Sequence, residues 1–288
     1  MRSVASSLPI GIFDSGVGGL TVWKELRRQL PGESFIYLGD TMRLPYGDRS
    51  PAEIVHGVRD IVGWMLKQPV KAIVMACNTS SALALEQVRD TCPVPILGLI
   101  LPGARAAVKQ GQRIGVIATA ATANSHAYRN AIGEINPHLD CWEMACPQFV
   151  PLIEAGHLDT PDLHEAVRDY LAPLLDHRID TLISGCTHYP LIEPAIRNAI
   201  PGSVVLIDPA VSLATAVARE LDFLGMRDYR SRTSTTHFCV SGNDGDRFAE
   251  LAANWIHPER PGDRIHVDHI ALPAISPAAV EVRKRMKE

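Results

Sequence analysis

The chain has 288 residues, of which 46% are hydrophobic and 21% charged, the composition of an ordinary globular protein rather than a disordered or fibrous one. Its formal net charge of −4 gives no electrostatic basis for binding nucleic acid or an anionic membrane surface. A chain of this length exceeds the usual size of one domain. We therefore expect two modest domains or one large α/β unit.

The first nine residues, Met1–Pro9, are too few and too polar for a secretory signal. The most apolar later stretch, Val94–Val108, is broken by prolines and an arginine well before the roughly 18 apolar residues that a membrane-spanning helix needs. We therefore expect a cytoplasmic protein without a membrane segment. Because the cytosol keeps thiols reduced, the six cysteines are not expected to form a disulfide framework.

Short apolar runs alternate with longer amphipathic segments along the chain, which predicts βαβ units and parallel sheets. Each run is nearly continuously apolar, as expected for strands covered on both faces. The clearest helix is Pro51–Lys67, with Ser50 as its N-cap and Glu53 completing a capping box. The predicted strands are Ile10–Phe13, Ser34–Leu38, Lys71–Ala76, Val94–Leu99, Arg113–Ala118, Asp180–Ser184 and Val204–Ile207.

Two stretches recur along the chain. IGIFDS (10–15) is similar to IGVIAT (114–119), and AIVMACNT (72–79) is similar to TLISGCTH (181–188). The spacings nearly agree, which indicates two similar α/β lobes. The predicted fold is α/β, with two similar Rossmann-like or flavodoxin-like lobes, mostly parallel sheets and the active site at their interface. A further helix and strand after Asp208 are expected to rejoin the first lobe, giving lobe A (residues 1–99 plus 208–288) and lobe B (residues 100–207).

Ligands of open α/β sheets bind outside the carboxyl ends of the strands, so the residues just past each apolar run are candidate site residues. The first run leads into the glycine-rich turn Asp14–Gly19, whose backbone N–H groups could approach an anion or simply close a tight turn. The second run leads into Gly39-Asp40 and then Pro45-Tyr46-Gly47, a turn that carries an aromatic hydroxyl.

Two cysteines follow predicted strands in matching positions of the two lobes: Cys77, followed by Asn-Thr, and Cys186, followed by Thr-His. A thiol at a strand end that faces the next helix N-terminus lies where partial positive charge lowers its pKa from a free value of about 8.5. A single buried cysteine is usually inert, but a matched pair favours a functional role. The cysteines without this setting, which we interpret as structural, are Cys92, Cys141, Cys146 and Cys239.

Four segments carry a family resemblance: IGIFDSGVGG (10–19), YLGDTMRLPYG (37–47), IVMACNTSSA (73–82) and LISGCTHYPL (182–191). In order and spacing they resemble the motifs of the cofactor-independent aspartate/glutamate racemase family, and the similarity covers nearly the whole chain. Aspartate racemases of that family typically have Glu where this chain has His188, so the Thr187-His188 pair resembles the glutamate racemases. Ser80 stands where many relatives have Ala, which we do not expect to alter the reaction.

The resemblance implies that Cys77 and Cys186 flank the α-carbon of glutamate, with Asp14 supporting the first cysteine and His188 the second. It also implies a bacterial enzyme that supplies D-glutamate for peptidoglycan, and we expect a homodimer. Asp40 and Glu154 match other acidic positions that the family keeps near its site. The substrate-binding positions implied are Asp14, Ser15, Pro45, Tyr46, Gly47, Asn78, Thr79, Thr119, Thr122 and Thr187.

Racemisation needs one group to remove the α-proton while another returns a proton to the opposite face, and the free pKa of cysteine suits both roles. Backbone amides and the hydroxyls of Ser15, Thr79 and Thr187 would then bind the carboxylates. Pyridoxal phosphate would require a lysine at a strand end or phosphate-binding turn. We expect no cofactor and no metal, since no lysine is so placed among Lys24, Lys67, Lys71, Lys109, Lys284 and Lys287.

Three other functions stay open at the level of sequence. An aspartate racemase or a related racemase of the same superfamily is the nearest. A metal hydrolase could use Cys186 and His188, although Cys-x-His lacks further ligands at the usual spacing. A nucleotide-binding regulatory module could hold a phosphate at Asp14–Gly19.

Overall fold

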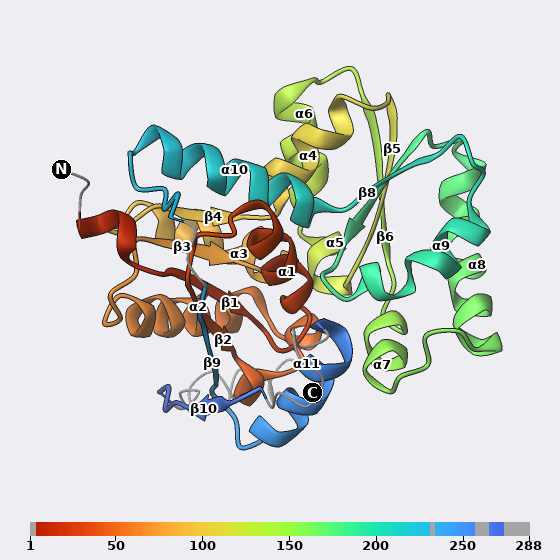
Figure 1. Ribbon diagram of the computed structural model, residues 1–288. Helices are drawn as coiled ribbons and strands as arrows, with labels where there is room; N and C mark the ends of the chain where they lie inside the picture. Colours follow the sequence, from red (N-terminus) through yellow and green to blue (C-terminus); the bar gives the residue numbers. More distant parts are fainter. Residues whose placement is uncertain (1–3, 231–233, 257–264, 274–288) are drawn as a thin grey trace.

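The computed structural model describes residues 4–230, 234–256 and 265–273, and within them the strands form two sheets that lie in separate halves of the molecule (Figure 1). All strand pairs in both sheets are parallel. The first sheet has the order β10-β9-β2-β1-β3-β4. Its strands are β1 (Ile10–Asp14), β2 (Phe35–Gly39), β3 (Ala72–Met75), β4 (Ile96–Gly98), β9 (Thr236–Val240) and β10 (Val267–His269).

The second sheet has the order β6-β5-β7-β8 and consists of β5 (Arg113–Ala118), β6 (Asp140–Ala145), β7 (Thr181–Gly185) and β8 (Val205–Ile207). The α-helices are α1 (Leu20–Gln29), α2 (Pro51–Met65), α3 (Asn78–Arg89), α4 (Ile100–Val108), α5 (Ala120–Asn124), α6 (Ala127–Ile135), α7 (Phe149–Glu154), α8 (Pro161–Asp176), α9 (Glu193–Ala199), α10 (Pro209–Phe223) and α11 (Gly245–Ile256). Short 3-10 turns are η1 (Val4–Ser7), η2 (Thr41–Arg43), η3 (Tyr46–Asp48) and η4 (Tyr189–Ile192).

The two sheets share one topology. In each, the first strand of the lobe lies between the second and the third, and the fourth follows the third, as in flavodoxin-like folds. The point where the strand order reverses, between β1 and β3 in one sheet and between β5 and β7 in the other, is where such folds bind ligands. The predicted fold class of two similar, parallel α/β lobes is therefore confirmed.

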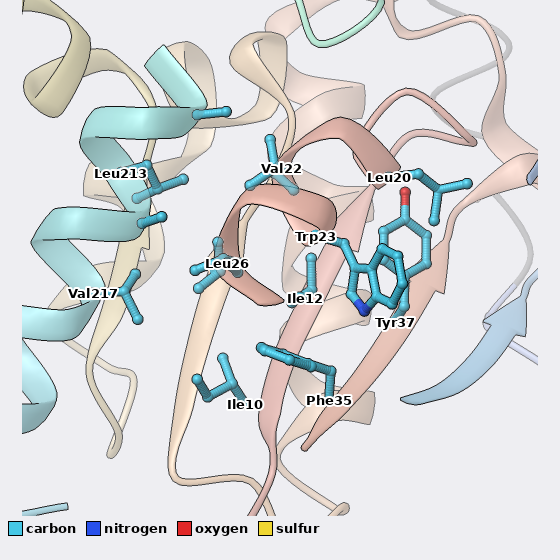
Figure 2. Close-up of a cluster of buried hydrophobic side chains, with 14 of the residues drawn as sticks. Ile10, Ile12, Leu20, Val22, Trp23, Leu26, Phe35, Tyr37, Leu213 and Val217 are labelled. Carbon is cyan, nitrogen blue, oxygen red and sulfur yellow. The ribbon is translucent and has the colours of Figure 1, made fainter. Parts of the chain in front are cut away.

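Both faces of the first sheet are covered, which explains its nearly continuous apolar strands. On one face, α1 and α10 pack their apolar side chains against β1 and β2, with Trp23 and Leu26 of α1 facing Phe35 and Ile10 (Figure 2). On the other face, α2 and α3 pack against the opposite side chains of the same strands. Helix α2 begins at Pro51 with the predicted capping box of Ser50 and Glu53, and it ends at Met65 rather than Lys67.

The chain passes between the halves twice, from β4 into α4 and from β8 into α10, and these two helices pack against each other. After the second crossing α10 packs on α1, and β9 pairs with β2, so the chain returns to the first sheet. Strands β6 and β10 were not predicted, and the strand expected after Asp208 was predicted without bounds. No helix in the described ranges is both long and apolar enough to cross a membrane.

Candidate active site

Cys77 lies between β3 and α3, at the N-cap of the helix, and its Sγ accepts the backbone N–H of Ser80 at 3.5 Å. The side chain is 5% exposed. Burial, reinforced by the negative charge of Asp14, raises the pKa of Cys77 to about 12. The expectation that the helix N-terminus would lower this pKa is wrong, because burial outweighs the hydrogen bond. Cys77 is accordingly a protonated thiol at neutral pH.

Asp14 ends β1 and is almost completely buried. Its Oδ2 accepts the backbone N–H groups of Gly16 and Gly19, each at 3.0 Å, so the glycine-rich turn binds this carboxylate. Its Oδ1 is buried without a hydrogen-bond partner in the described structure. Burial raises the pKa of Asp14, while the charge of His188 and the backbone N–H groups oppose that rise. Asp14 therefore has one oxygen fixed and one oxygen available within the site.

Cys186 follows β7, and its Sγ lies 3.8 Å from Nδ1 of His188. The other ring nitrogen of His188 lies 3.0 Å from Oε1 of Glu154, at the end of α7. Burial alone would lower the pKa of His188, but its hydrogen bonds to Cys186 and Glu154 prevail and raise it to about 10. The hydrogen bond from His188 in turn lowers the pKa of Glu154. His188 is thus an imidazolium held between a carboxylate and a cysteine.

Three threonine hydroxyls meet where the two lobes face each other. Thr79 of α3 lies 3.0 Å from Thr119 and 3.0 Å from Thr122 of the α5 segment, and the latter two are also 3.0 Å apart. Beside them, the buried Tyr128 hydroxyl donates to Oδ1 of Asn78 at 2.7 Å. The contacts made by Thr79 and Asn78 join residues that follow β3 to residues that follow β5, so polar groups of both lobes close the site on this side.

Asp40 anchors the turn that carries Tyr46. Its carboxylate is fully buried and accepts the hydroxyls of Tyr46 at 2.6 Å and Ser241 at 2.7 Å. Arg43, itself 2% exposed, donates to Asp40 at 3.0 Å and to Asp60 at 2.7 Å. Burial raises the pKa of Tyr46 well above its usual value, with smaller contributions from Asp40 and Cys77. Asp40 therefore positions Tyr46 near the first cysteine.

The remaining predicted residues lie around the same space. Ser15 places its Oγ 4.0 Å from the sulfur of Cys77. A Cβ atom built on Gly47 would lie 3.8 Å from Cβ of Thr119, and Pro45 precedes it in the same turn. Thr187 follows Cys186, and its carbonyl accepts the Thr21 hydroxyl. Cys186 adds electrostatically to the rise in the pKa of Cys77.

Three residues that contribute to the site were not predicted from the sequence: Arg43, Tyr128 and Trp255. The ring of Trp255 contacts that of His188. None stands just past a predicted strand, and each reaches its partner through the fold. The cysteines predicted to be structural, Cys92, Cys141, Cys146 and Cys239, have free thiols, and Cys146 and Cys239 are buried.

Other binding chemistry has little support in the described residues. They contain no group of three or more His, Cys, Asp or Glu side chains that could hold a metal ion. Lys71 pairs with Glu33 at 2.5 Å and binds the carbonyl of Ser6, at the opposite end of the sheet from Cys77. Lys284 and Lys287 lie outside the described residues. A cavity of about 970 Å³ between β4, α4 and α10 is lined by none of the predicted site residues.

Residues 10–217 match the family model described as Asp/Glu/Hydantoin racemase. A glutamate racemase from Trichormus variabilis is 56% identical over 248 residues, covering 86% of this chain and 84% of that protein. A glutamate racemase from Bacillus anthracis superposes with a TM-score of 0.87 at 38% identity, over 93% of this chain and 99% of that one.

A third structure, of glutamate racemase from Francisella tularensis in complex with D-glutamate, gives a TM-score of 0.85 at 33% identity, over 92% of this chain and 98% of that one. The family match spans well over half of the chain, and these relatives share nearly its whole length. The chain therefore belongs to the Asp/Glu/hydantoin racemase family and, within it, to the glutamate racemases.

Proposed function

We propose that Cys77 and Cys186 interconvert L- and D-glutamate as two opposed acid/base groups, without a cofactor. The observation that carries this proposal is their placement: each follows the third strand of its own sheet, at the point where the strand order reverses. Two thiols that approach one carbon from different lobes can act on its opposite faces, which racemisation requires.

The two cysteines lie in opposite electrostatic settings. Cys77 is a thiol, because burial and Asp14 raise its pKa to about 12. The sulfur of Cys186 instead lies 3.8 Å from Nδ1 of the His188 imidazolium, so it faces a positive charge. We propose that Cys186 removes the α-proton of L-glutamate, that Cys77 then delivers a proton to the other face of the resulting carbanion, and that the roles reverse for D-glutamate. Asp14 supports proton transfer at Cys77, and His188, oriented by Glu154, supports it at Cys186.

The polar groups that surround the cysteines suit an amino acid with two carboxylates. We propose that backbone amides and hydroxyls bind them, as preorganised donors do for developing negative charge. Asn78 is held by Tyr128, and Tyr46 is held by Asp40, so both are fixed before substrate arrives. The proposed binding residues are Asp14, Ser15, Pro45, Tyr46, Gly47, Asn78, Thr79, Thr119, Thr122 and Thr187.

The cellular setting follows from this reaction. We propose that the protein is a cytoplasmic homodimer. Within each subunit, lobe A (1–99 plus 208–288) and lobe B (100–207) would move as units to admit glutamate. Closure of the lobes would exclude water from the carbanion-like transition state. The product, D-glutamate, serves peptidoglycan synthesis in this family, and the complex of the Francisella tularensis relative with D-glutamate supports glutamate as the substrate here.

A direct assay tests the proposal. Purified protein is mixed with L- or D-glutamate, with a metal chelator and no added pyridoxal phosphate, and circular dichroism follows the loss of optical activity. Both enantiomers should reach the same racemic mixture, because they have equal free energies. A parallel panel with L- and D-aspartate decides between the glutamate and aspartate activities. Loss of turnover on chelation, an absorbing cofactor, or preference for aspartate would reject the proposal.

A further inference from the structure

The segment of lobe B that carries Cys186, Thr187 and His188 is in contact with helix α1 of lobe A. Thr21, in the first turn of α1, places its Oγ1 2.9 Å from the carbonyl oxygen of Thr187 and 3.0 Å from that of Gly18. The bond to Thr187 joins residues 166 positions apart and crosses between the lobes. The backbone next to His188 is therefore tied to lobe A.

Gly18 makes the closest approach in this contact. A Cβ atom built on Gly18 would lie 2.4 Å from Nδ1 of His188 and 2.6 Å from Oγ1 of Thr187. Any side chain at this position would overlap the ring, so the spacing between α1 and His188 depends on glycine here. Nδ1 is also the ring atom that faces the sulfur of Cys186, at 3.8 Å. A methyl group on Gly18 would act directly on the atom that partners the catalytic thiol.

Helix α11 of lobe A contacts the same histidine. The Trp255 ring meets the His188 ring edge to face, with the centroids 5.6 Å apart, and Trp255 packs against the hydrophobic cores of both lobes. From the same helix, the charge of Arg247 helps to lower the pKa of Glu154, the second partner of His188. Gly18, Thr21 and Trp255, which we call the lobe A contact, together limit where the imidazolium can lie.

We propose that the lobe A contact is a positioning device for Cys186: Gly18 and Thr21 fix His188 against the Cys186 sulfur only when the two lobes are closed. The inference rests on the proposed two-thiol function. Opening of the lobes would separate Thr21 from Thr187 and remove α1 from the His188 ring. The acid/base pair of lobe B is then complete only around enclosed substrate, which couples closure to proton transfer.

Two substitutions with matched controls test whether the lobe A contact positions His188 for transfer at Cys186. Gly18→Ala should lower kcat about 100-fold, the scale on which a misplacement of about 1 Å acts on a reacting group. Thr21→Val should lower kcat about tenfold, the equivalent of one neutral hydrogen bond, and Thr21→Ser should restore it. Gly133→Ala, where a Cβ meets nothing within 4 Å, is the control for the first. Thr215→Val, which also removes a hydroxyl bonded to a helix carbonyl, is the control for the second.

Isotope effects separate positioning from a general loss of structure. If transfer at Cys186 becomes slow, it limits turnover in both directions. From L-glutamate the slow step then breaks the α-carbon bond to hydrogen, so the α-deuterium isotope effect on kcat/KM should rise. From D-glutamate the slow step instead delivers a solvent-derived proton to the α-carbon, so the α-deuterium isotope effect on kcat/KM should fall. A smaller fraction of correctly folded enzyme would leave both isotope effects at their wild-type values.

The outcomes are distinct. Opposite shifts of the two isotope effects in Gly18→Ala and Thr21→Val, absent from both controls, support the inference. Wild-type isotope effects in Thr21→Val would overturn the inference, and so would a Thr21→Ser variant as slow as Thr21→Val. If Gly18→Ala does not fold, the comparison of Thr21→Val with Thr21→Ser decides the test. Should the wild-type protein fail to racemise glutamate, the proposed function fails instead. The two failures are therefore distinguishable.

Discussion

The sulfur of Cys186 lies 3.8 Å from Nδ1 of His188, an imidazolium that is bonded in turn to Glu154. The sulfur of Cys77 instead accepts a backbone N–H and lies near the carboxylate of Asp14. The duplicated fold thus presents two cysteines in equivalent positions but in opposite electrostatic settings. A positive charge faces the sulfur of Cys186 and a negative charge lies near that of Cys77, an asymmetry that suits two thiols with opposite acid/base roles.

Each cysteine should be required on its own face of the substrate. Cys77→Ala and Cys186→Ala should each lower kcat by about 10³-fold or more, because general acid/base catalysis contributes on that order. Cys239→Ala is a matched control, since Cys239 is fully buried in β9 and outside the site. It should lower the melting temperature and leave kcat unchanged. A Cys77→Ala or Cys186→Ala enzyme with nearly wild-type turnover would refute the two-thiol assignment.

The pH profile should report the imidazolium. The pKa of His188 is raised from 6.5 to about 10, so the charged form persists through neutral pH and is lost as the pH rises through about 10. In Glu154→Gln one cause of the rise is gone and burial still opposes the charge. The alkaline limb of kcat/KM should therefore move down by about 1 to 2 pH units, the scale of one charge-assisted hydrogen bond.

Glu193→Gln, which removes an exposed glutamate paired with Arg197 in α9, should leave that limb in place. If Glu154→Gln and Glu193→Gln gave superimposable pH profiles, Glu154 would have no role in holding the charge on His188.

Asp14 should act mainly on the transition state. Its negative charge raises the pKa of Cys77, so Asp14→Asn should lower that pKa while preserving an oxygen for the N–H groups of Gly16 and Gly19. We expect kcat to fall more than KM rises, as for a group that supports proton transfer. Thiolate absorbance of Cys77, measured in a Cys186→Ser background, gives the pKa. A raised KM at unchanged kcat would make Asp14 a binding residue only.

The sequence predicted the parts of the fold that depend on continuous apolar runs. Seven strands lie where such runs were found. Five of them are internal strands covered on both faces, namely β1, β2, β3, β5 and β7. The other two, β4 and β8, are edge strands, but their three residues contain no polar side chain. The edge strand β6 was missed because its one exposed and five partly buried residues include Asp140 and Glu143. Strand β9 begins with the partly exposed Thr236 and the exposed His237, so its apolar part is too short to define its bounds.

The site residues also divide into those that the sequence predicts and those that depend on the assembled fold. Asp14, Cys77 and Cys186 could be predicted because the carboxyl ends of parallel strands converge at one edge of each sheet. Tyr128 could not, since its bond to Asn78 spans 50 positions and depends on how the lobes face each other. The direction of the Cys77 pKa shift could not be predicted from the sequence either. Burial of the thiol outweighs the effect of the helix N-terminus, and burial depends on the assembled fold.

Asp208 is the N-cap of α10, where the chain passes between the lobes. We expect its buried negative charge to lower the free energy of unfolding at neutral pH. Burial raises its pKa from 3.8 to about 6, so the folded state favours the protonated acid. That preference stabilises the protein fully below a pH of about 4 and is lost as the pH rises through about 6. Asp208→Asn keeps an oxygen for the N–H of Ala210 and carries no charge.

Urea denaturation should therefore show Asp208→Asn more stable than wild type by about 2 to 3 kcal/mol at a pH of about 7.5, and equal to it at a pH of about 4. A variant that is less stable at the higher pH would show that the charge of Asp208 is stabilising where it lies.

Solvent isotope incorporation tests two bases against one. L-Glutamate turned over in deuterated water should receive its new hydrogen from a Cys77 thiol that has exchanged with solvent. D-Glutamate should then carry deuterium at the α-carbon from the earliest time points, while the remaining L-glutamate stays largely unlabelled. Mass spectrometry of the separated enantiomers measures both.

A single base that moved between the two faces would return part of the original proton, so early D-glutamate would retain substantial protium. That result would contradict the two-thiol mechanism even if both cysteines proved essential, because it would show that one group serves both faces. The Cys239→Ala enzyme, whose substitution lies outside the site, should give the wild-type labelling pattern. The duplicated position of Cys77 and Cys186 in the two sheets is the reason to expect deuterium, since one thiol would leave the second without a function.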